Sequence, residues 1–393
     1  MSNWPSVGWE EETWQPTSNW GVQANSPAAA LTYRAAVPPH IAPLSPSLDR
    51  ATAMAVEEAG RELSRFDAEL GARVASFAPV LLRSESASSS QIENLTASAR
   101  SILTAELGVH RSRNADLIAA NTRSIQAAIE LAGDISGNAI LRMHAVLMEN
   151  QPRHTPGAFR KEAVWVGTRS DSPTGAEFVA PQHGRVRALV ADLVDFSRRR
   201  DLPAVTLVAV AHAQFETIHP FTDGNGRTGR ALAQALLRAT GTTRNVAVPV
   251  SAGLLADVEG YHRALTTYRE GDPLPIILAF CDAAARAVGN SRTLIAELDE
   301  IRLSWNARLN ARRNSNAWKL LDVLIRRPVL NAASAAAEIG VQLPNVYPPL
   351  RALADAGILA SKHEHGHGPF WRSEEVLDAL DRFAARAGRR EAA

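Results

Sequence analysis

Twelve consecutive residues, HPFTDGNGRTGR at positions 219–230, combine the side-chain types that phosphate chemistry requires. The stretch lies between two segments with helical patterns, so its Gly-Asn-Gly turn is predicted to start the second helix. Such a turn exposes free N–H groups at the positive end of a helix, which favours an anion. Arg227 and Arg230 add guanidinium groups that suit a polyphosphate. Asp223 supplies the carboxylate that Mg²⁺ prefers, and His219 can accept a hydroxyl proton near neutral pH.

The stretch resembles the signature of the Fic family, His-x-Phe-x-Asp/Glu-Gly-Asn-Gly-Arg-x-x-Arg, and matches it at every defining position. Enzymes of that family transfer AMP from ATP to protein hydroxyl groups. A twelve-residue match of this density is far more specific than a lone glycine-rich loop. The resemblance covers roughly residues 31–300 and implies a nucleotidyltransferase with a mainly α-helical fold. It also implies Mg²⁺ as cofactor, with ATP and a target protein as partners.

The resemblance implies a role for each residue of the motif. His219 would deprotonate a Ser, Thr or Tyr hydroxyl of the target, which then attacks the α-phosphate, and Asp223 would hold Mg²⁺. Phe221 is expected to pack in the core and fix the loop. The related Doc kinases lack a complete Gly-Asn-Gly turn and transfer the terminal phosphoryl group, so the intact turn favours AMP transfer. The residues implied to bind the phosphates of ATP are Gly224, Asn225, Gly226, Arg227 and, for the γ-phosphate, Arg230.

Two weaker matches to the same family lie outside the motif. Residues 156–182 have apolar runs on either side of a Gly-, Pro- and Ser-rich turn, which predicts a β-hairpin. This hairpin resembles the family's flap, which clamps the target by main-chain pairing, and Val166 and Gly167 fall at the clamping position. Tyr261 falls where family members often contact the base side of the nucleotide.

A predicted switch lies more than a hundred residues upstream, in the stretch SSQIEN. Ser89, Glu93 and Asn94 match the Ser/Thr-x-x-x-Glu-Gly/Asn pattern of the family's inhibitory helix. The resemblance implies that Glu93 pairs with Arg230 and obstructs seating of the γ-phosphate. A tethered carboxylate is a competitor at high effective concentration, so the inhibition is physically reasonable. Some family members use this Glu to position water and remove AMP, and the sequence leaves both directions open.

The remaining pattern predicts helices around one small hairpin, in four segments of chain. Residues 1–30 are rich in Trp and acidic, residues 31–110 carry the inhibitory helix, residues 111–300 form the Fic core, and residues 314–393 form a winged-helix-like domain. The apolar spacing predicts a helix over about 48–70 and a second one after Pro79. It also predicts two helices over 115–150, a long one ending near Ile218, one over 226–238, and two more over 254–269 and 273–300. A polar joint, WNARLNARRNSN, would separate the last domain.

The two ends of the chain each allow two interpretations. Residues 1–30 show no lasting strand or helix period, and their four Trp residues either dock on a partner or fold back on the chain. The last domain has the element order of a winged helix, so a DNA-associated regulator with a nucleotide-sensing core is the rival function. Pro348 and Pro349 would break a recognition helix, and ten basic against nine acidic residues over 314–393 suit phosphates poorly. A protein-contact or homodimer role is therefore favoured over DNA binding.

Composition excludes several other classes of protein. The 393 residues include 42 basic and 41 acidic ones, a formal net charge of +1 that argues against a polybasic nucleic-acid binder. A single cysteine, Cys281, excludes a disulfide framework and fits a reducing compartment. No run of 18 apolar residues occurs, and the N-terminus lacks the pattern of a signal peptide. We therefore expect a cytoplasmic protein with no membrane contact.

Overall fold

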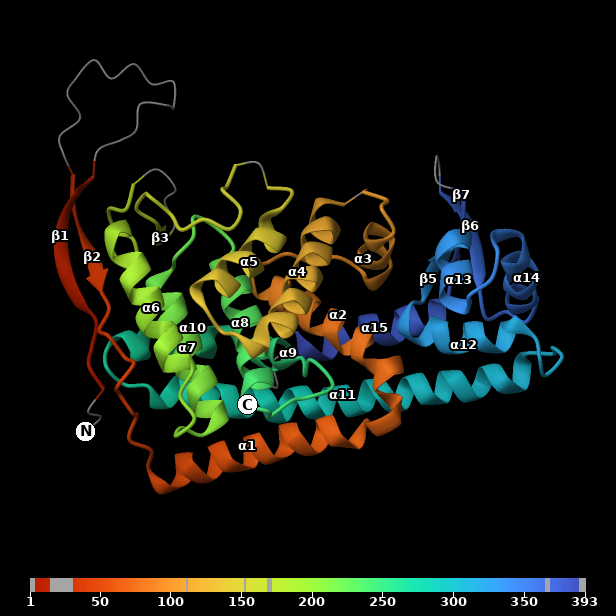
Figure 1. Cartoon of the computed structure of the whole chain (residues 1–393), viewed down its shortest axis with the longest axis horizontal. Coiled ribbons are helices and arrows are strands. Elements are labelled where there is room, and N and C mark those ends of the chain that lie inside the picture. Colours follow the sequence, from red (N-terminus) through yellow and green to blue (C-terminus); the bar gives the residue numbers. More distant parts are fainter. Residues whose placement is uncertain are drawn as a thin grey trace, which may run out of the picture.

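The computed structural model describes residues 4–14, 31–110, 112–151, 153–167, 172–364 and 368–388. These described residues form mainly α-helices, with three small antiparallel sheets, which confirms the predicted fold class. Figure 1 shows the helices as a bundle lying on two long ones, α1 (Arg50–Glu69) and α11 (Leu274–Arg308), which run side by side. The other helices before α11 are α2 (Val74–Ile92), α3 (Ala99–Glu106), α4 (Arg113–Glu130), α5 (Gly137–Met148), α6 (Val186–Ser197), α7 (Ala204–Ile218), α8 (Asn225–Ala239), α9 (Val250–Leu255) and α10 (Val258–Arg269).

Helix α7 lies at the centre of this bundle. Its sequence, AVTLVAVAHAQFETI, is apolar on every face, and every residue from Val205 to Ile218 is buried. A helix that is hydrophobic all round must be enclosed by others, and α6, α8 and α11 all pack on it. The pair α7–α8 is therefore held rigidly where the 219–230 motif joins the two helices.

Helix α2 brings its serine-rich side into the protein interior. Ser86 donates to the Ile118 carbonyl of α4 at 2.8 Å, and Asn121 of α4 donates to the Ser90 hydroxyl at 3.2 Å. Small hydroxyl side chains let the two helices approach closely while their polar atoms stay bonded. The prediction that α2 begins after Pro79 is wrong, because the helix starts at Val74 and carries Pro79 in its interior.

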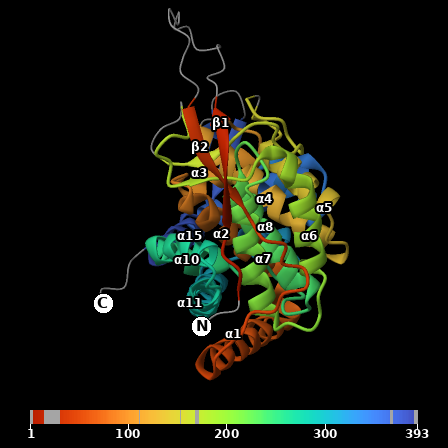
Figure 2. The ribbon, with the colours of Figure 1, turned by 90° about the vertical axis from the view of Figure 1, so that its left-hand side faces the viewer.

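Two β-hairpins cover one end of the bundle, the end that faces the viewer in Figure 2. Strands β1 (Gly8–Trp14) and β2 (Leu31–Val37) pair along seven residues, whereas β3 (Trp165–Val166) and β4 (Phe178–Val179) pair along two. The strand β1 was not predicted. Trp4 is buried against Tyr268 and Trp9 contacts Phe178 edge-on, so this part of the Trp-rich segment folds back on its own chain. Of its four Trp residues, Trp20 lies outside the described residues.

The C-terminal module, residues 316–388, lies mostly at the opposite end of α11 from the hairpins, and its last helix runs back along α11 towards α2 and α9 (Figure 1). Its three strands are antiparallel in the order β5-β7-β6. Its elements are α12 (Asn316–Arg326), β5 (Val329–Asn331), α13 (Ala332–Ile339), α14 (Tyr347–Asp355), β6 (Ala360–Glu364), β7 (Gly368–Arg372) and α15 (Glu374–Ala387).

Two expectations about this end of the chain are wrong. Pro348 and Pro349 do not break a helix, because α14 begins at Tyr347 and both prolines fall in its first turn, where no N–H partner is needed. The polar joint after residue 300 is partly helical, since α11 continues to Arg308. Trp305 within it is fully buried and its indole N–H donates to Glu375 of α15. One buried indole thus ties the end of α11 to the module.

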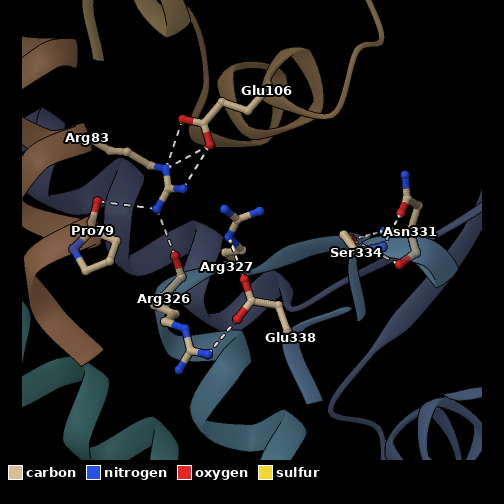
Figure 3. Close-up of polar contacts among 8 residues, drawn as sticks. All are labelled: Pro79, Arg83, Glu106, Arg326, Arg327, Asn331, Ser334 and Glu338. Atoms are coloured by element: carbon tan, nitrogen blue, oxygen red, sulfur yellow. Dashed lines mark hydrogen bonds and ion pairs between the residues drawn. The ribbon is translucent and has the colours of Figure 1, made fainter. Parts of the chain in front are cut away.

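An arginine network joins the module to α2, as Figure 3 shows. Arg83 of α2 donates to both carboxylate oxygens of Glu106 and, at 2.8 Å, to the main-chain carbonyl of Arg326. Glu338 of α13 in turn pairs with Arg326 and Arg327. Helices α12 and α15 both pack on α2, so the module directly contacts the helix that precedes Glu93.

Candidate active site

The loop between α7 and α8 has a left-handed backbone conformation at both ends, and the one at His219 is strained. His219, the residue after α7, has φ 49° in the left-handed region. Asn94 shares this conformation, and these two are the positive-φ residues other than glycine in the described chain. Gly224 precedes α8 at φ 74°, and a Cβ there would lie 3.1 Å from Leu147 and Met148. Strain of this kind costs on the order of 1–3 kcal/mol per non-glycine residue and clusters at functional sites.

His219 is set up to act as a base. Its Nδ1 lies 3.3 Å from the Glu216 carbonyl, so a neutral ring that donates from Nδ1 leaves the Nε2 lone pair free. Burial lowers the pKa of the imidazole to about 4, and the guanidinium groups of Arg269 and Arg160 act in the same direction. The ring is therefore neutral at pH 7, which is the form that accepts a proton.

Asn225 fixes the shape of the loop with its side chain. Its amide oxygen accepts from the Phe221 N–H and its amide nitrogen donates to the Phe221 carbonyl, both at 2.9 Å. Phe221 is fully buried, as expected. The Asn225 side chain thus serves the loop, and only its main-chain N–H is left to serve a phosphate.

His144 of α5 supports the same loop and was missed in the sequence. Its ring stacks on Phe221 with centroids 3.7 Å apart. Its Nδ1 accepts from the Gly157 N–H at 3.0 Å, which leaves Nε2–H to donate to the Asp223 carbonyl at 3.1 Å. His144 is buried and lies 75 residues before the motif, so no local pattern identifies it.

The start of α8 opens onto a cavity of about 560 Å³ that is suited to an anion. Arg227 is buried at its edge, and its Nε and Nη1 atoms have no partner among the described residues. The nearest carboxylate oxygen to Arg227, on Asp223, is 3.9 Å away. Leaving buried guanidinium donors unpaired is costly, so an incoming phosphate would recover that free energy. His219, Glu93 and the whole Asp223–Arg227 segment line this cavity.

Asp223 lines the cavity, and one of its carboxylate oxygens accepts a hydrogen bond. Its Oδ1 accepts from the Gly224 N–H at 2.7 Å, and its Oδ2 lies 3.6 Å from His154 Nε2. Within the described ranges no three His, Cys, Asp or Glu side chains gather as a metal cage. A single half-exposed carboxylate beside a phosphate cradle fits Mg²⁺, which keeps several waters and binds through one or two carboxylates and substrate phosphates.

Glu93 and Arg230 are in contact, although 137 residues separate them. Arg230 donates from Nη2 to Glu93 Oε1 at 2.7 Å and to the Ser89 carbonyl at 2.8 Å, and from Nε to the Ser89 hydroxyl at 2.9 Å. Burial opposes ionisation of Glu93, but the Arg230 charge outweighs it and holds the pKa of the carboxyl below its usual value. Glu93 is therefore an anion at pH 7, seated on the second arginine of the motif.

Asn94 explains how Glu93 reaches this position. It follows the end of α2 at φ 59°, a conformation that glycine and asparagine adopt more readily than other residues. A Cβ on Gly226 would lie 2.0 Å from Glu93 Oε1, so the carboxylate presses directly on the first turn of α8. The left-handed turn thus accounts for Asn94, and the approach of the Glu93 carboxylate accounts for Gly226.

The remaining predicted site residues lie apart from the cavity. Val166 is exposed on β3, where its carbonyl accepts from the Glu177 N–H, and Gly167 approaches Ala176 so closely that a Cβ would lie 3.1 Å from the Ala176 Cα. Tyr261 is buried, and its hydroxyl bonds to His212 Nε2 at 2.7 Å. Its side chain does not line the cavity at His219.

Comparisons with known proteins agree with this geometry. The Fic/DOC family model matches residues 134–237. Protein adenylyltransferase fic-1 of Caenorhabditis briggsae is 33% identical over 111 residues, which are 28% of this chain and 20% of that protein. Protein adenylyltransferase Fic of Drosophila willistoni is 28% identical over 158 residues, 39% of this chain and 29% of that protein. The chain thus spans less than a third of the length of these curated relatives.

A solved structure extends the likeness of fold beyond the motif. The crystal structure of a Fic family protein from Desulfovibrio desulfuricans G20 covers 83% of this chain and 97% of its own, with a TM-score of 0.52 and 21% identity. At that identity the likeness concerns the fold alone. The family match places a Fic/DOC family domain at residues 134–237, within the fold that the chain shares with this solved structure.

Proposed function

We propose that the chain is a protein adenylyltransferase, which transfers AMP from ATP to a Ser, Thr or Tyr hydroxyl of a target protein. One observation carries the proposal: the neutral imidazole of His219 lines the same cavity at the start of α8 as Arg227, whose Nε and Nη1 atoms have no partner among the described residues. A base and an anion cradle in one cavity suit transfer between a phosphate and a hydroxyl group. The curated relatives that the chain matches over part of its length are named protein adenylyltransferases.

In the proposed reaction the target hydroxyl oxygen attacks the α-phosphorus of ATP. The bond from that phosphorus to the β-phosphate oxygen breaks, pyrophosphate leaves, and the hydroxyl proton moves to Nε2 of His219. The first N–H groups of α8 and Arg227 would hold the phosphates, and Arg230 would take the γ-phosphate. When bound at Asp223, Mg²⁺ would neutralise charge on the phosphate oxygens.

The proposal includes inhibition by Glu93, because its carboxylate already occupies Arg230. Glu93 also lines the cavity, so positioning a water molecule for removal of AMP is a second candidate activity. Addition of AMP consumes ATP, whereas removal of AMP consumes the modified protein. Protein that carries AMP would lose it on incubation without ATP if removal operates, and this loss would require Glu93.

The phosphate that is transferred decides between adenylyl and phosphoryl transfer. We expect protein with Glu93 replaced by glycine to become radioactive with ATP labelled in the α-phosphate and to stay unlabelled with ATP labelled in the γ-phosphate. The physical reason is the intact Gly224–Gly226 turn, which favours seating the β- and γ-phosphates at α8. Labelling from the γ-phosphate alone would overturn the proposal in favour of a kinase.

The pH dependence of the reaction follows from the buried position of His219. The neutral ring is the active form, so activity is lost as pH falls through the lowered pKa of about 4, not through the usual value near 6.5. Arg160 and Arg269 favour the neutral ring, while Glu93 favours the protonated one. We expect kcat/KM to stay flat from about pH 8 down to about pH 6, with tryptophan fluorescence used to verify folding. A half-loss of kcat/KM near pH 6.5 would contradict this.

We propose that the C-terminal module is a winged-helix-like domain and that it serves in protein contact or homodimerisation. Its basic and acidic residues nearly balance, which weakens binding to DNA phosphates.

Among the described helices, none has the length and apolar character that a membrane span requires.

A further inference from the structure

One buried arginine outside the motif contacts the main chain of the proposed base. Arg160 lies in the GAFR stretch that precedes β3, and its side chain is almost fully buried. Its Nε donates to the His219 carbonyl at 2.8 Å, and its Nη2 lies 3.4 Å from the Ile218 carbonyl. Its main-chain N–H donates to the Pro220 carbonyl at 3.0 Å. Three successive carbonyls around the strained residue are therefore bonded to Arg160.

The same guanidinium closes the base of the β3–β4 hairpin. Its Nη1 donates to the Glu162 carbonyl at 3.0 Å, three residues before β3, and its Nη2 donates to the Pro181 carbonyl at 2.5 Å, two residues after β4. Both ends of the hairpin and the turn at His219 thus converge on one planar group.

The geometry requires an arginine at this position. A guanidinium offers five N–H donors in a fixed plane, whereas a lysine ammonium offers three on a compact centre and cannot span carbonyls on opposite sides. Burial lowers the pKa of Arg160 to about 10, yet the group remains charged at pH 7. The carbonyl dipoles around it replace the water that burial removes.

We propose that Arg160 is a positioning residue, which holds the left-handed turn at His219 in register with the base of the hairpin that would clamp the target. A target segment paired with β3 is thereby presented to Nε2 of His219 rather than merely bound nearby. Arg160 does not line the cavity at α8, so it acts through His219 and not on ATP. The inference rests on the proposed AMP transfer.

The test compares Arg160→Lys and Arg160→Ala in the Glu93→Gly protein, with AMP transfer measured as incorporation of α-phosphate label. Because misplacing a reacting group by about 1 Å can cost about 10²-fold in rate, we expect kcat to fall by about that factor in both variants. The KM for ATP should change by less than about threefold, since the phosphate groups of α8 are untouched. Guanidinium at about 10 mM, well below denaturing concentrations, should restore part of the kcat of Arg160→Ala and none of that of Arg160→Lys.

Arg198→Ala is the matched control, because Arg198 also donates to a main-chain carbonyl, that of Ile135 at 3.0 Å, but lies away from the motif. Its kcat should stay within about twofold of the parent. Should Arg160→Ala fail to fold, Arg160→Lys, which keeps the charge and the aliphatic chain, decides the matter. A kcat for Arg160→Lys within about threefold of the parent, or an equal loss in Arg198→Ala, would overturn the inference. A parent Glu93→Gly protein without any AMP transfer would instead refute the proposed function.

Discussion

Replacing Glu93 by glycine is expected to raise auto-modification with AMP by at least about tenfold, the effect of removing a competitor worth about 1.4 kcal/mol. In the wild-type protein the Glu93 carboxylate is bonded to Arg230 at 2.7 Å and presses on Gly226. Its removal frees the guanidinium for the γ-phosphate and opens the first turn of α8. Incorporation of label from α-phosphate-labelled ATP at equal protein concentration measures the change.

Glu106→Gly provides the matched control for this substitution. Like Glu93, Glu106 accepts a hydrogen bond from an arginine; its partner is Arg83 of α2, at 2.9 Å. This pair lies away from the cavity at His219. Its loss should leave labelling within about twofold of wild type if only the Glu93 carboxylate blocks the site. Equal labelling of wild type and Glu93→Gly would remove the inhibitory role. An increase in Glu106→Gly as large as that in Glu93→Gly would show a general loosening of α2 instead.

Replacing His219 by alanine in the Glu93→Gly protein is expected to lower the rate of AMP transfer by about 10²–10⁴-fold, the usual contribution of a general base. The affinity for ATP should be largely kept, because Arg227, Arg230 and the N–H groups of α8 do not depend on the imidazole. The rate is measured by label incorporation and the affinity by calorimetry in the presence of Mg²⁺.

His110→Ala serves as the control for the histidine substitution. His110 is exposed, pairs with Asp116 and lies outside the cavity, so its loss should not change the rate. Full activity in the His219→Ala protein would mean that another group takes the hydroxyl proton. Loss of ATP binding together with activity would mean that the substitution collapses the loop.

The sequence was most informative where one short stretch contains a whole site. The spacing of the 219–230 motif requires no knowledge of distant neighbours, because the turn and the helix start are local features. The Glu93–Arg230 contact spans 137 residues, yet each partner belongs to a recognisable local pattern. The mainly helical fold followed from apolar periodicity in the same way.

Supporting residues were missed because their partners come from elsewhere in the chain. His144 and Arg160 each stand alone in the sequence, and only the packing of α5 and the hairpin against the loop reveals their bonds to Asp223 and His219. One role within the motif was also missed: the side chain of Asn225 bonds to the main chain of Phe221 and closes the loop. Tyr261 shows the converse, because a tyrosine at a suggestive position is buried against His212.

The predictions of strands and of helix ends were wrong for a related reason. The strand β1 contains three consecutive glutamates and shows no clean alternation, and it is extended because it pairs with β2 and Trp9 reaches Phe178. Pro349 was judged by its effect inside a helix, whereas the chain places it in a first turn. Tertiary contacts decide both cases, and a single sequence does not display them.

Intact-mass spectrometry after incubation with ATP and Mg²⁺ tests the central claim most directly. Four proteins are compared: wild type, Glu93→Gly, His219→Ala and the double variant. The account predicts a mass increase of one or more AMP groups on Glu93→Gly, little on wild type, and none on either protein that lacks His219. An AMP adduct that persists without His219, or a phosphoryl mass in place of AMP on Glu93→Gly, would contradict it.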